Sequence, residues 1–217
     1  MTELLIKGGL SYLLGSIIGS LLAAYLTGAA DIRALGSGNA GATNALRTQG
    51  RQFAFWVLLI DVSKGWIATA PLAAAPLAPG ALGPVPHLQA WDVPVCGIAV
   101  MLGHVYPVFF GFRGGKGVAT LVGAVLGISG WLLLPMILTW LAAVMLFGFV
   151  GLASMLAAIA LAVTIALRNL DVPLLVFGIA AALLILFTHR ANLARMYAGT
   201  ENRARRLWVF RPRGGHA

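Results

Sequence analysis

Residues 131–168 read WLLLPMILTWLAAVMLFGFVGLASMLAAIALAVTIALR, and no charged side chain interrupts this stretch before Arg168 at its end. A helix that crosses a hydrocarbon core of about 30 Å needs roughly 20 mostly apolar residues. Gly148 and Gly151 weaken helix continuity in the middle of the stretch, which divides it into segments 131–148 and 151–168. The stretch therefore predicts two neighbouring membrane helices.

Apolar segments of the same kind occupy most of the chain, and they predict an all-α polytopic membrane protein. Of 217 residues, 60% are hydrophobic and 10% are charged, far fewer charges than a soluble domain carries. We expect seven segments, at 4–26, 53–75, 93–110, 117–129, 131–148, 151–168 and 173–188, with a glycine-rich break at 127–130. The fourth is short for a span and is interpreted as a half-helix or re-entrant piece. The first lacks a signal-peptide pattern and is expected to be a retained helix.

The basic residues predict how these segments are oriented. Lys and Arg gather in connections 27–52 and 111–116 and after residue 189, whereas 76–92 and 169–172 contain none. The positive-inside rule then places the N-terminus outside and the C-terminus in the cytoplasm, with Arg168 as the one exception. The net charge of +9 is accordingly a membrane signal and not a nucleic-acid footprint. We expect one domain, 1–217, whose basic tail 202–217 either lies on anionic headgroups or is solvated.

Three polar, glycine-rich segments interrupt the apolar pattern, all on the expected cytoplasmic face. The first reads Gly36-Ser37-Gly38-Asn39-Ala40-Gly41-Ala42-Thr43-Asn44-Ala45-Leu46-Arg47. Its glycine spacing matches a dinucleotide-binding fingerprint, which is rejected because that motif follows a strand and these flanks are membrane helices. Glycines nevertheless let successive N–H groups converge on an anion, and the hydroxyls, the amides and Arg47 add donors. We therefore expect a phosphate site, with a short helix starting at Ala42.

The second and third polar segments carry further candidate phosphate ligands. Phe112-Arg113-Gly114-Gly115-Lys116-Gly117 differs from a Walker loop in its glycine spacing and in the residue after Lys116. Arg113 and Lys116 are either phosphate-binding cations or simply positive-inside charges. His189-Arg190-Ala191-Asn192-Leu193-Ala194-Arg195 follows the last apolar segment. If that helix continues, His189 and Asn192 share a face, where the histidine is a candidate general base, a phosphate donor or an interfacial polar end.

Ionisable residues inside the apolar segments are the remaining candidates. Asp61 and Lys64 share a helix face and are expected to pair, either as a structural support or for catalysis. His104 is interpreted as a packed residue, close to a kink at Pro107. His87-Leu88-Gln89-Ala90-Trp91-Asp92 fits the His-x-x-x-x-Asp pattern of another acyltransferase class, but it lies in the proline-rich loop on the opposite face. A lone Cys96 and no Cys/His cluster predict neither a disulfide nor a metal site.

Taken together, these blocks closely resemble the bacterial acyl-phosphate:glycerol-3-phosphate acyltransferase family. They stand in the family's order over the whole chain, and Gly199-Thr200-Glu201 extends the last of them. The resemblance implies a seven-span enzyme of the bacterial plasma (inner) membrane whose active site faces the cytoplasm. It would transfer a fatty acyl group from acyl phosphate to the 1-hydroxyl of sn-glycerol 3-phosphate, giving lysophosphatidate and phosphate for membrane phospholipid synthesis. No metal, cofactor, nucleic acid or required protein partner is implied.

The resemblance also implies roles for individual residues. The phosphate-binding set would comprise Gly36, Ser37, Gly38, Asn39, Gly41, Thr43, Arg47, Arg113 and Lys116. The catalytic set would comprise Ser37, Lys116, His189 and Asn192, with Asp61, Lys64, His104, Arg195 and Glu201 in support. Because acyl phosphate has a good leaving group, we expect direct transfer, in which alignment contributes roughly 7–11 kcal/mol. Either His189 or a substrate phosphate oxygen takes the hydroxyl proton. Two alternative functions are a membrane transporter of a phosphate-bearing anion and a lipid-phosphate phosphatase.

Overall fold

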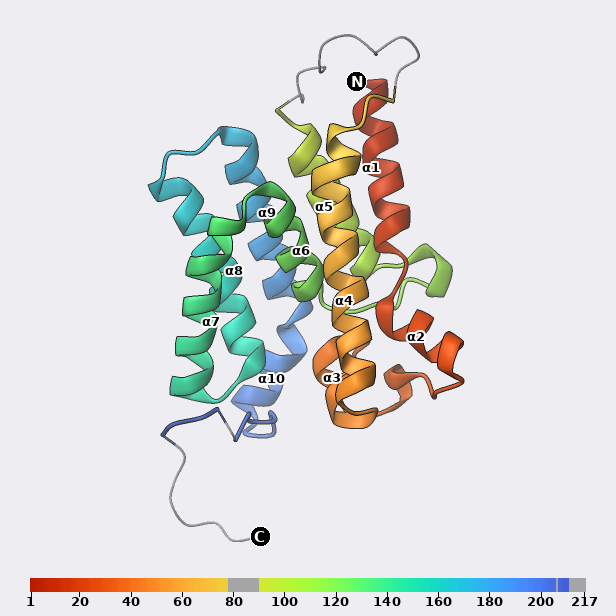
Figure 1. Ribbon diagram of the computed structural model, residues 1–217. Helices are drawn as coiled ribbons and strands as arrows, with labels where there is room; N and C mark the ends of the chain where they lie inside the picture. The colour runs from red at the N-terminus through yellow and green to blue at the C-terminus, as the bar shows by residue number, and fades with distance from the viewer. Residues whose placement is uncertain (78–89, 206, 211–217) are drawn as a thin grey trace, which may run out of the picture.

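The two helices expected within 131–168 are present and pack against each other. The computed structural model describes residues 1–77, 90–205 and 207–210, and its regular structure is helical (Figure 1). Helix α7 spans Leu133–Phe147 and α8 spans Val150–Leu167. Gly148 ends α7 in the left-handed conformation, with φ of 77°. The glycine break predicted here is confirmed, because a residue without a Cβ adopts this conformation at no steric cost.

Helix lengths support several membrane crossings. Four stretches are long and apolar enough to cross alone: Arg51–Leu72, Asp92–Phe110, Gly130–Phe147 and Val150–Leu167. The first consists of α4 (Arg51–Ile67) and the π-helical turn η2 (Ala68–Leu72). Two bent pairs, Thr2–Gly15 with Gly19–Thr27 and Val172–Thr188 with Arg190–Tyr197, would raise the number among described residues to 6. Helix α6, Val118–Ile128, is too short to span alone, as expected. The protein is an all-helical polytopic membrane protein.

The expectation of one continuous helix over 4–26 is wrong. Helix α1 (Thr2–Gly15) and α2 (Gly19–Thr27) are bent by 47° at a break between them. Such a break leaves carbonyl and N–H groups without partners inside the helix, so other groups must satisfy them. The buried side chain of Lys64 does this for two carbonyls, as the Nζ atom lies 3.0 Å from Gly15 O and 2.8 Å from Ile17 O.

The expected segment 93–110 ends earlier as a helix than the hydropathy pattern indicates, whereas the segment 173–188 ends where expected. Helix α5 covers Asp92–Val105, and the 3₁₀ turn η3 (Val108–Phe110) follows Pro107. The expected kink at Pro107 is thus a termination, because the residue before a proline is disfavoured in the helical conformation. Helix α9 (Val172–Thr188) does not continue straight through His189. It bends by 49° into α10 (Arg190–Tyr197).

Glycines let the helices approach closely around the break. Helix α1 packs on α5, and α4 packs on α6. A Cβ on Gly103 would overlap the backbone of Tyr12, and one on Gly65 would overlap the backbone of Thr120. Small residues of this kind are how membrane helices gain packing contacts without a hydrophobic driving force.

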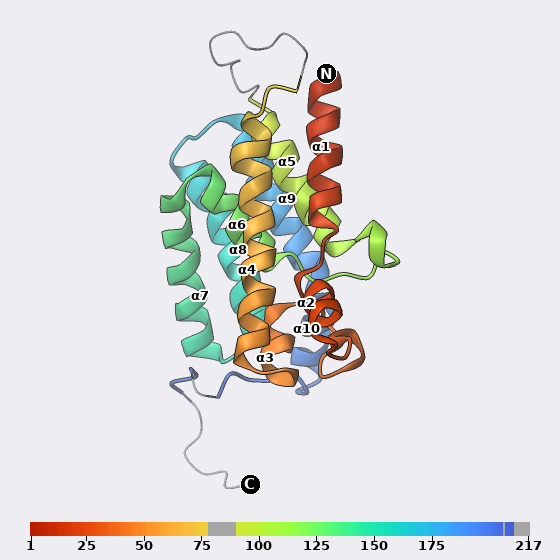
Figure 2. The ribbon, with the colours of Figure 1, turned by 45° about the vertical axis from the view of Figure 1, so that its right-hand side comes forward.

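The polar connections converge at one end of the bundle. Helices α2 and α10, together with α3 (Ala42–Thr48), lie there in both views (Figures 1 and 2). The 3₁₀ turn η1 (Ile32–Ala34) lies between α2 and α3 in sequence, and η4 (Gly130–Leu132) precedes α7. The described part of the tail packs against the end of α7, where Ala204 N–H donates to Gly148 O at 2.7 Å and Trp208 Nε1 donates to Leu146 O at 3.1 Å. Residues 206 and 211–217 of the predicted basic tail lie outside the described residues.

Candidate active site

The first polar segment is a loop organised by the buried side chain of Asn44. Its Oδ1 accepts a hydrogen bond from Ser37 N–H at 2.9 Å, and its Nδ2 donates to Ile32 O at 2.9 Å and Leu35 O at 3.0 Å. Asn44 is 1% exposed, so these bonds form away from competing solvent. The expected short helix at Ala42 is confirmed as α3. The loop is therefore held in place before any ligand binds.

The second polar segment is held against the end of α5. Gly114 N–H donates to Val105 O at 3.2 Å and Gly115 N–H to His104 O at 3.1 Å. A Cβ on Gly114 would overlap His104 O, which explains the glycine by close backbone approach. Gly117, with φ of 88°, then turns the chain into the N-terminus of α6. The Lys116 side chain thus stands beside a helix N-terminus, where the helix dipole favours an anion.

The third polar segment forms a hydrogen-bonded chain that ends on Lys116. Arg195 Nε donates to Glu201 Oε2 at 2.7 Å, and Asn192 Nδ2 donates to Glu201 Oε1 at 2.7 Å. The Lys116 ammonium in turn donates to Asn192 Oδ1. His189 Nδ1 lies 2.8 Å from Ile185 O. Since a carbonyl only accepts, Nδ1 carries the proton and Nε2 is left as an acceptor.

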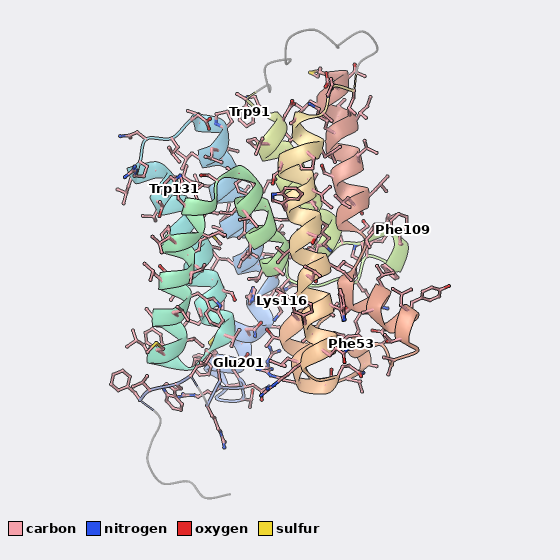
Figure 3. The ribbon with its side chains drawn as sticks, viewed as in Figure 1. Phe53, Trp91, Phe109, Lys116, Trp131 and Glu201 are labelled. Carbon is pink, nitrogen blue, oxygen red and sulfur yellow. The ribbon has the colours of Figure 1, made fainter. Side chains whose placement is uncertain are left out.

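One cavity of about 460 Å³ joins the three segments. Most of the expected site residues line it: Ser37, Asn39, Gly41, Thr43, Arg47, Asp61, His104, Lys116, His189, Asn192, Arg195 and Glu201. The rest of its wall is largely apolar and comes from α6, α7 and α8, including Leu121, Ile137 and Trp140. Figure 3 shows Lys116 and Glu201 towards the end of the bundle opposite Trp91. The cavity is thus amphipathic, with a cationic end and an apolar body.

Four expected site residues do not line this cavity. Gly36 and Gly38 shape the first loop with φ of 57° and 71°. Lys64 lies behind the cavity wall, and Arg113 is exposed. The backbone of Arg113 is nevertheless fixed near the site, because its carbonyl accepts from Arg33 Nη1 at 2.9 Å.

Sequence reasoning missed two residues that build the site, Asn44 and Arg33. Asn44 stood inside the quoted first block, but only its contacts distinguish it from the neighbouring donors. Arg33 is one of the basic residues of connection 27–52, which the sequence marks only as cytoplasmic. In the structure Asp31 holds its guanidinium beside the second loop, with an Nη2–Oδ2 distance of 2.7 Å. No pattern in the sequence predicts that a charged side chain will bind backbone carbonyls of a distant loop.

The electrostatics of the cavity favour an anion. Burial is the main cause that lowers the pKa of Lys116 to about 8, and the positive charges of Arg195 and Arg47 lower it further. Glu201 acts in the opposite direction but is already bound to Arg195. A lysine whose nearest partner is a neutral amide gains most from a bound phosphate, which would restore its preference for the charged form. Among described residues, no group of three or more His, Cys, Asp or Glu side chains is placed to hold a metal ion.

The expected pairing of Asp61 and Lys64 is confirmed, and it lies at the break between α1 and α2. The two side chains are 2.9 Å apart and almost fully buried. Asp61 Oδ1 also accepts from Gly19 N–H, at the start of α2, at 3.2 Å. Asp61 and Lys64 therefore satisfy backbone groups on both sides of the break, which places α2 and the first loop after it.

Asp92 of the His-x-x-x-x-Asp pattern does not line this cavity. His87 lies outside the described residues. Asp92 is buried and bound to Lys7 at 2.8 Å, and Lys7 also donates to Ala73 O at 2.8 Å. Trp91, the neighbour of Asp92, lies at the opposite end of the bundle from Glu201 (Figure 3). Asp92 is part of a structural ion pair between α1 and α5.

Comparison with known proteins identifies the family. The family described as glycerol-3-phosphate acyltransferase matches residues 5–199. The chain belongs to the glycerol-3-phosphate acyltransferase family. A glycerol-3-phosphate acyltransferase of Chlorobaculum tepidum is 40% identical over 216 residues, which cover 89% of this chain and 93% of the relative. One from Coxiella burnetii is 41% identical over 199 residues, covering 90% and 95%.

Solved structures of this family share the fold. The crystal structure of PlsY (YgiH), an integral membrane glycerol 3-phosphate acyltransferase, in its glycerol 3-phosphate form matches with a TM-score of 0.80 at 35% identity, covering 92% of this chain and 94% of that chain. The lysophosphatidic acid form matches with a TM-score of 0.78 at 34% identity over the same shares. This glycerol-3-phosphate acyltransferase is accordingly an integral, multi-pass membrane protein.

Proposed function

We propose that this chain transfers a fatty acyl group from acyl phosphate to the 1-hydroxyl of sn-glycerol 3-phosphate, which gives lysophosphatidate and phosphate. The observation that carries the proposal is the single amphipathic cavity, which joins a cationic end to an apolar body. The relatives crystallised with glycerol 3-phosphate and with lysophosphatidic acid support the acceptor and the product. The product is the precursor from which membrane phospholipids are made.

The cationic end fits the phosphate groups of the two substrates. Arg47, Lys116 and Arg195 face it, together with the hydroxyls of Ser37 and Thr43. A guanidinium binds two phosphate oxygens at once, and a lysine adds a compact charge. Fixing both substrates against these groups turns a bimolecular reaction into one between aligned neighbours.

The apolar body fits the acyl chain of the donor. It is lined by the first part of α6, from Val118 to Val122, and by side chains of α7 between Leu133 and Leu141. Val122 of α6 and the partly exposed Leu141 of α7 lie along this wall, where a lipid-like donor would enter from the bilayer.

The chemistry requires one proton acceptor and no acyl-enzyme. The hydroxyl oxygen of glycerol 3-phosphate bonds to the carbonyl carbon, and the bond from that carbon to the phosphate oxygen breaks. The phosphate leaves with the electron pair, and Lys116 and Arg195 offset its charge. We assign the hydroxyl proton to Nε2 of His189, since the bond to Ile185 O fixes the proton on Nδ1.

The test of the donor uses the purified protein. Palmitoyl phosphate or palmitoyl-CoA is supplied with radiolabelled glycerol 3-phosphate, and label is counted in extracted lipid. We expect labelled lipid with acyl phosphate only. Absence of labelled lipid with both donors, from folded protein, would overturn the proposal. Liposome uptake of labelled glycerol 3-phosphate would then test transport, and phosphate release without glycerol 3-phosphate would test a phosphatase.

We further propose one domain with seven crossings, in which the short α6 completes a crossing besides the four long stretches and the two bent pairs, and a cavity that faces the cytoplasm of the bacterial inner membrane. Arg47, Lys116 and Arg195 line the cationic end of the cavity, and Arg33 binds the second loop nearby. The positive-inside rule assigns all four of these cations to the cytoplasmic side. A single-cysteine series in a Cys96→Ser background tests this orientation. We expect Asn169→Cys to react with an impermeant maleimide in intact cells and Asn202→Cys to react only after lysis. The reverse pattern would contradict it.

A further inference from the structure

His104 is a buried imidazole for which the reaction outlined above has no role. It is 2% exposed, yet it lines the cavity beside the Gly114–Gly117 loop. A Cβ on Gly115 would overlap its Nε2, which is the ring atom nearest to that Cβ position. The Nε2 edge of the ring therefore faces the loop that carries Lys116.

The opposite edge of the ring fixes which nitrogen carries the proton. Lys64 Nζ lies 2.8 Å from His104 Nδ1 and also binds Gly15 O at 3.0 Å and Ile17 O at 2.8 Å. An ammonium has no lone pair, and the three protons of Lys64 are shared among the two carbonyls, Asp61 Oδ1 and the ring nitrogen. A ring nitrogen 2.8 Å from such an ammonium has no acceptor for a proton of its own in that direction, so it accepts. Asp61 Oδ1 is farther from Nδ1, at 3.4 Å, and is itself 2.9 Å from Lys64. Nδ1 is therefore unprotonated, and the neutral ring carries its proton on Nε2.

We propose that His104 contacts substrate and donates a hydrogen bond from Nε2–H to a phosphate oxygen held at the Gly114–Gly117 loop. Within the described part of the chain, no residue accepts a hydrogen bond from this nitrogen. The oxygen belongs to the phosphate group of acyl phosphate or of glycerol 3-phosphate, which share this chemistry. His189 has the opposite tautomer, with Nε2 as acceptor. The cavity then contains one imidazole that donates and one that accepts.

The competing interpretation is that His104 only braces Lys64. Two substitutions separate the two roles because they keep different ends of the ring. In His104→Gln the amide nitrogen is as many bonds from the backbone as Nε2, so the donor at the loop is kept while the acceptor for Lys64 is lost. In His104→Asn the amide oxygen is as many bonds away as Nδ1, so the acceptor for Lys64 is kept while the donor is lost.

The assay is acyl transfer with palmitoyl phosphate and glycerol 3-phosphate, with the concentration of each varied in turn. The inference rests on the proposed function, so wild-type activity is established first. We expect His104→Asn to lower kcat/KM about 10- to 100-fold, the usual range for a hydrogen bond to a charged group, and His104→Gln to retain several times more activity. The substrate whose KM rises more in His104→Asn is the one whose phosphate His104 contacts.

The opposite ranking, with His104→Asn near wild type and His104→Gln impaired, would overturn the inference and leave a structural brace. Thermal unfolding of each purified variant shows whether lost activity reflects lost fold. A second measurement does not depend on activity: ¹⁵N NMR of His104 in the ligand-free protein. We expect Nε2 to be protonated and Nδ1 not, and the reverse assignment would also refute the inference. An inactive wild type with the expected tautomer would count against the proposed function and not against the tautomer.

Discussion

Lys64 and Lys116 are two lysines near one cavity, and their surroundings differ in the partners they offer. Lys64 has a carboxylate, two carbonyls and an imidazole nitrogen within 3.0 Å. Lys116 donates to a single neutral amide, that of Asn192, and its charged neighbours are Arg195, Arg47 and Glu201, of which Glu201 is already bound to Arg195. A satisfied buried charge maintains structure, whereas an under-partnered charge is available to bind an anion. The comparison separates the part of the site that positions from the part that binds.

The largest effect we expect is on stability, from Lys64→Met. The substitution leaves Asp61 buried without its partner and leaves the carbonyls of Gly15 and Ile17 unsatisfied, at a cost of about 3–5 kcal/mol. Thermal unfolding in detergent measures it. The double variant Asp61→Asn/Lys64→Met is the control, since it removes both charges and should recover part of the loss. An unchanged unfolding temperature in Lys64→Met would contradict the structural role.

The matching change in the binding region, Lys116→Met, should affect activity and leave the fold intact. Loss of a charge-assisted contact to phosphate is expected to lower kcat/KM about 100-fold. The unfolding temperature should stay the same or rise, because an under-partnered buried charge is removed. Radiolabelled acyl transfer and thermal unfolding on one preparation check both. A variant that loses stability as Lys64→Met does would erase the distinction between the two lysines.

A smaller effect on kinetics is expected from Gly115→Ala, in the Gly114–Gly117 loop that carries Lys116 and contacts His104, the neighbour of Lys64. A Cβ there would overlap the His104 ring, so the loop or the ring must move. Overpacking of this kind costs about 1–3 kcal/mol, and we expect a tenfold rise in KM for glycerol 3-phosphate, to order of magnitude. Gly9→Ala is the matched control, because nothing lies within 4 Å of its Cβ position. Equal kinetics in the two variants would show that the loop tolerates the shift.

The smallest effect is a pH dependence that belongs to Lys116. Its pKa is lowered from 10.5 to about 8, so raising the pH through this value removes the charge that binds phosphate. We expect kcat/KM to fall about threefold between pH 7.5 and 8.5. Stability should change with the opposite sign, since the unfolded chain binds more protons than the folded chain between pH 8 and 10.5.

Lys116→Arg is the control for this pH profile, because a guanidinium stays protonated throughout the range. Its kcat/KM should not fall over the same interval, whatever its absolute activity. A profile that is identical in the wild type and in Lys116→Arg would assign the pH dependence to another group.

Local patterns in the amino-acid sequence were sufficient to identify the bilayer as the solvent, the phosphate chemistry and the family. Long apolar runs without charges require a bilayer, and residues such as Arg47, Lys116 and His189 stand in short blocks whose composition indicates phosphate chemistry. These properties are local, so a pattern within a few residues reveals them. Even the pairing of Asp61 with Lys64 followed from their spacing on one helix.

The division of these groups between support and binding became visible in the folded chain. The break between α1 and α2, the exclusion of Arg113 from the cavity, and the parts played by Asn44 and Arg33 depend on contacts between residues far apart in sequence. The opposite tautomers of His104 and His189 are set by Lys64 and by the carbonyl of Ile185. Hydropathy and motifs describe what a segment contains, but a proton's position depends on the atom that faces it in the folded protein.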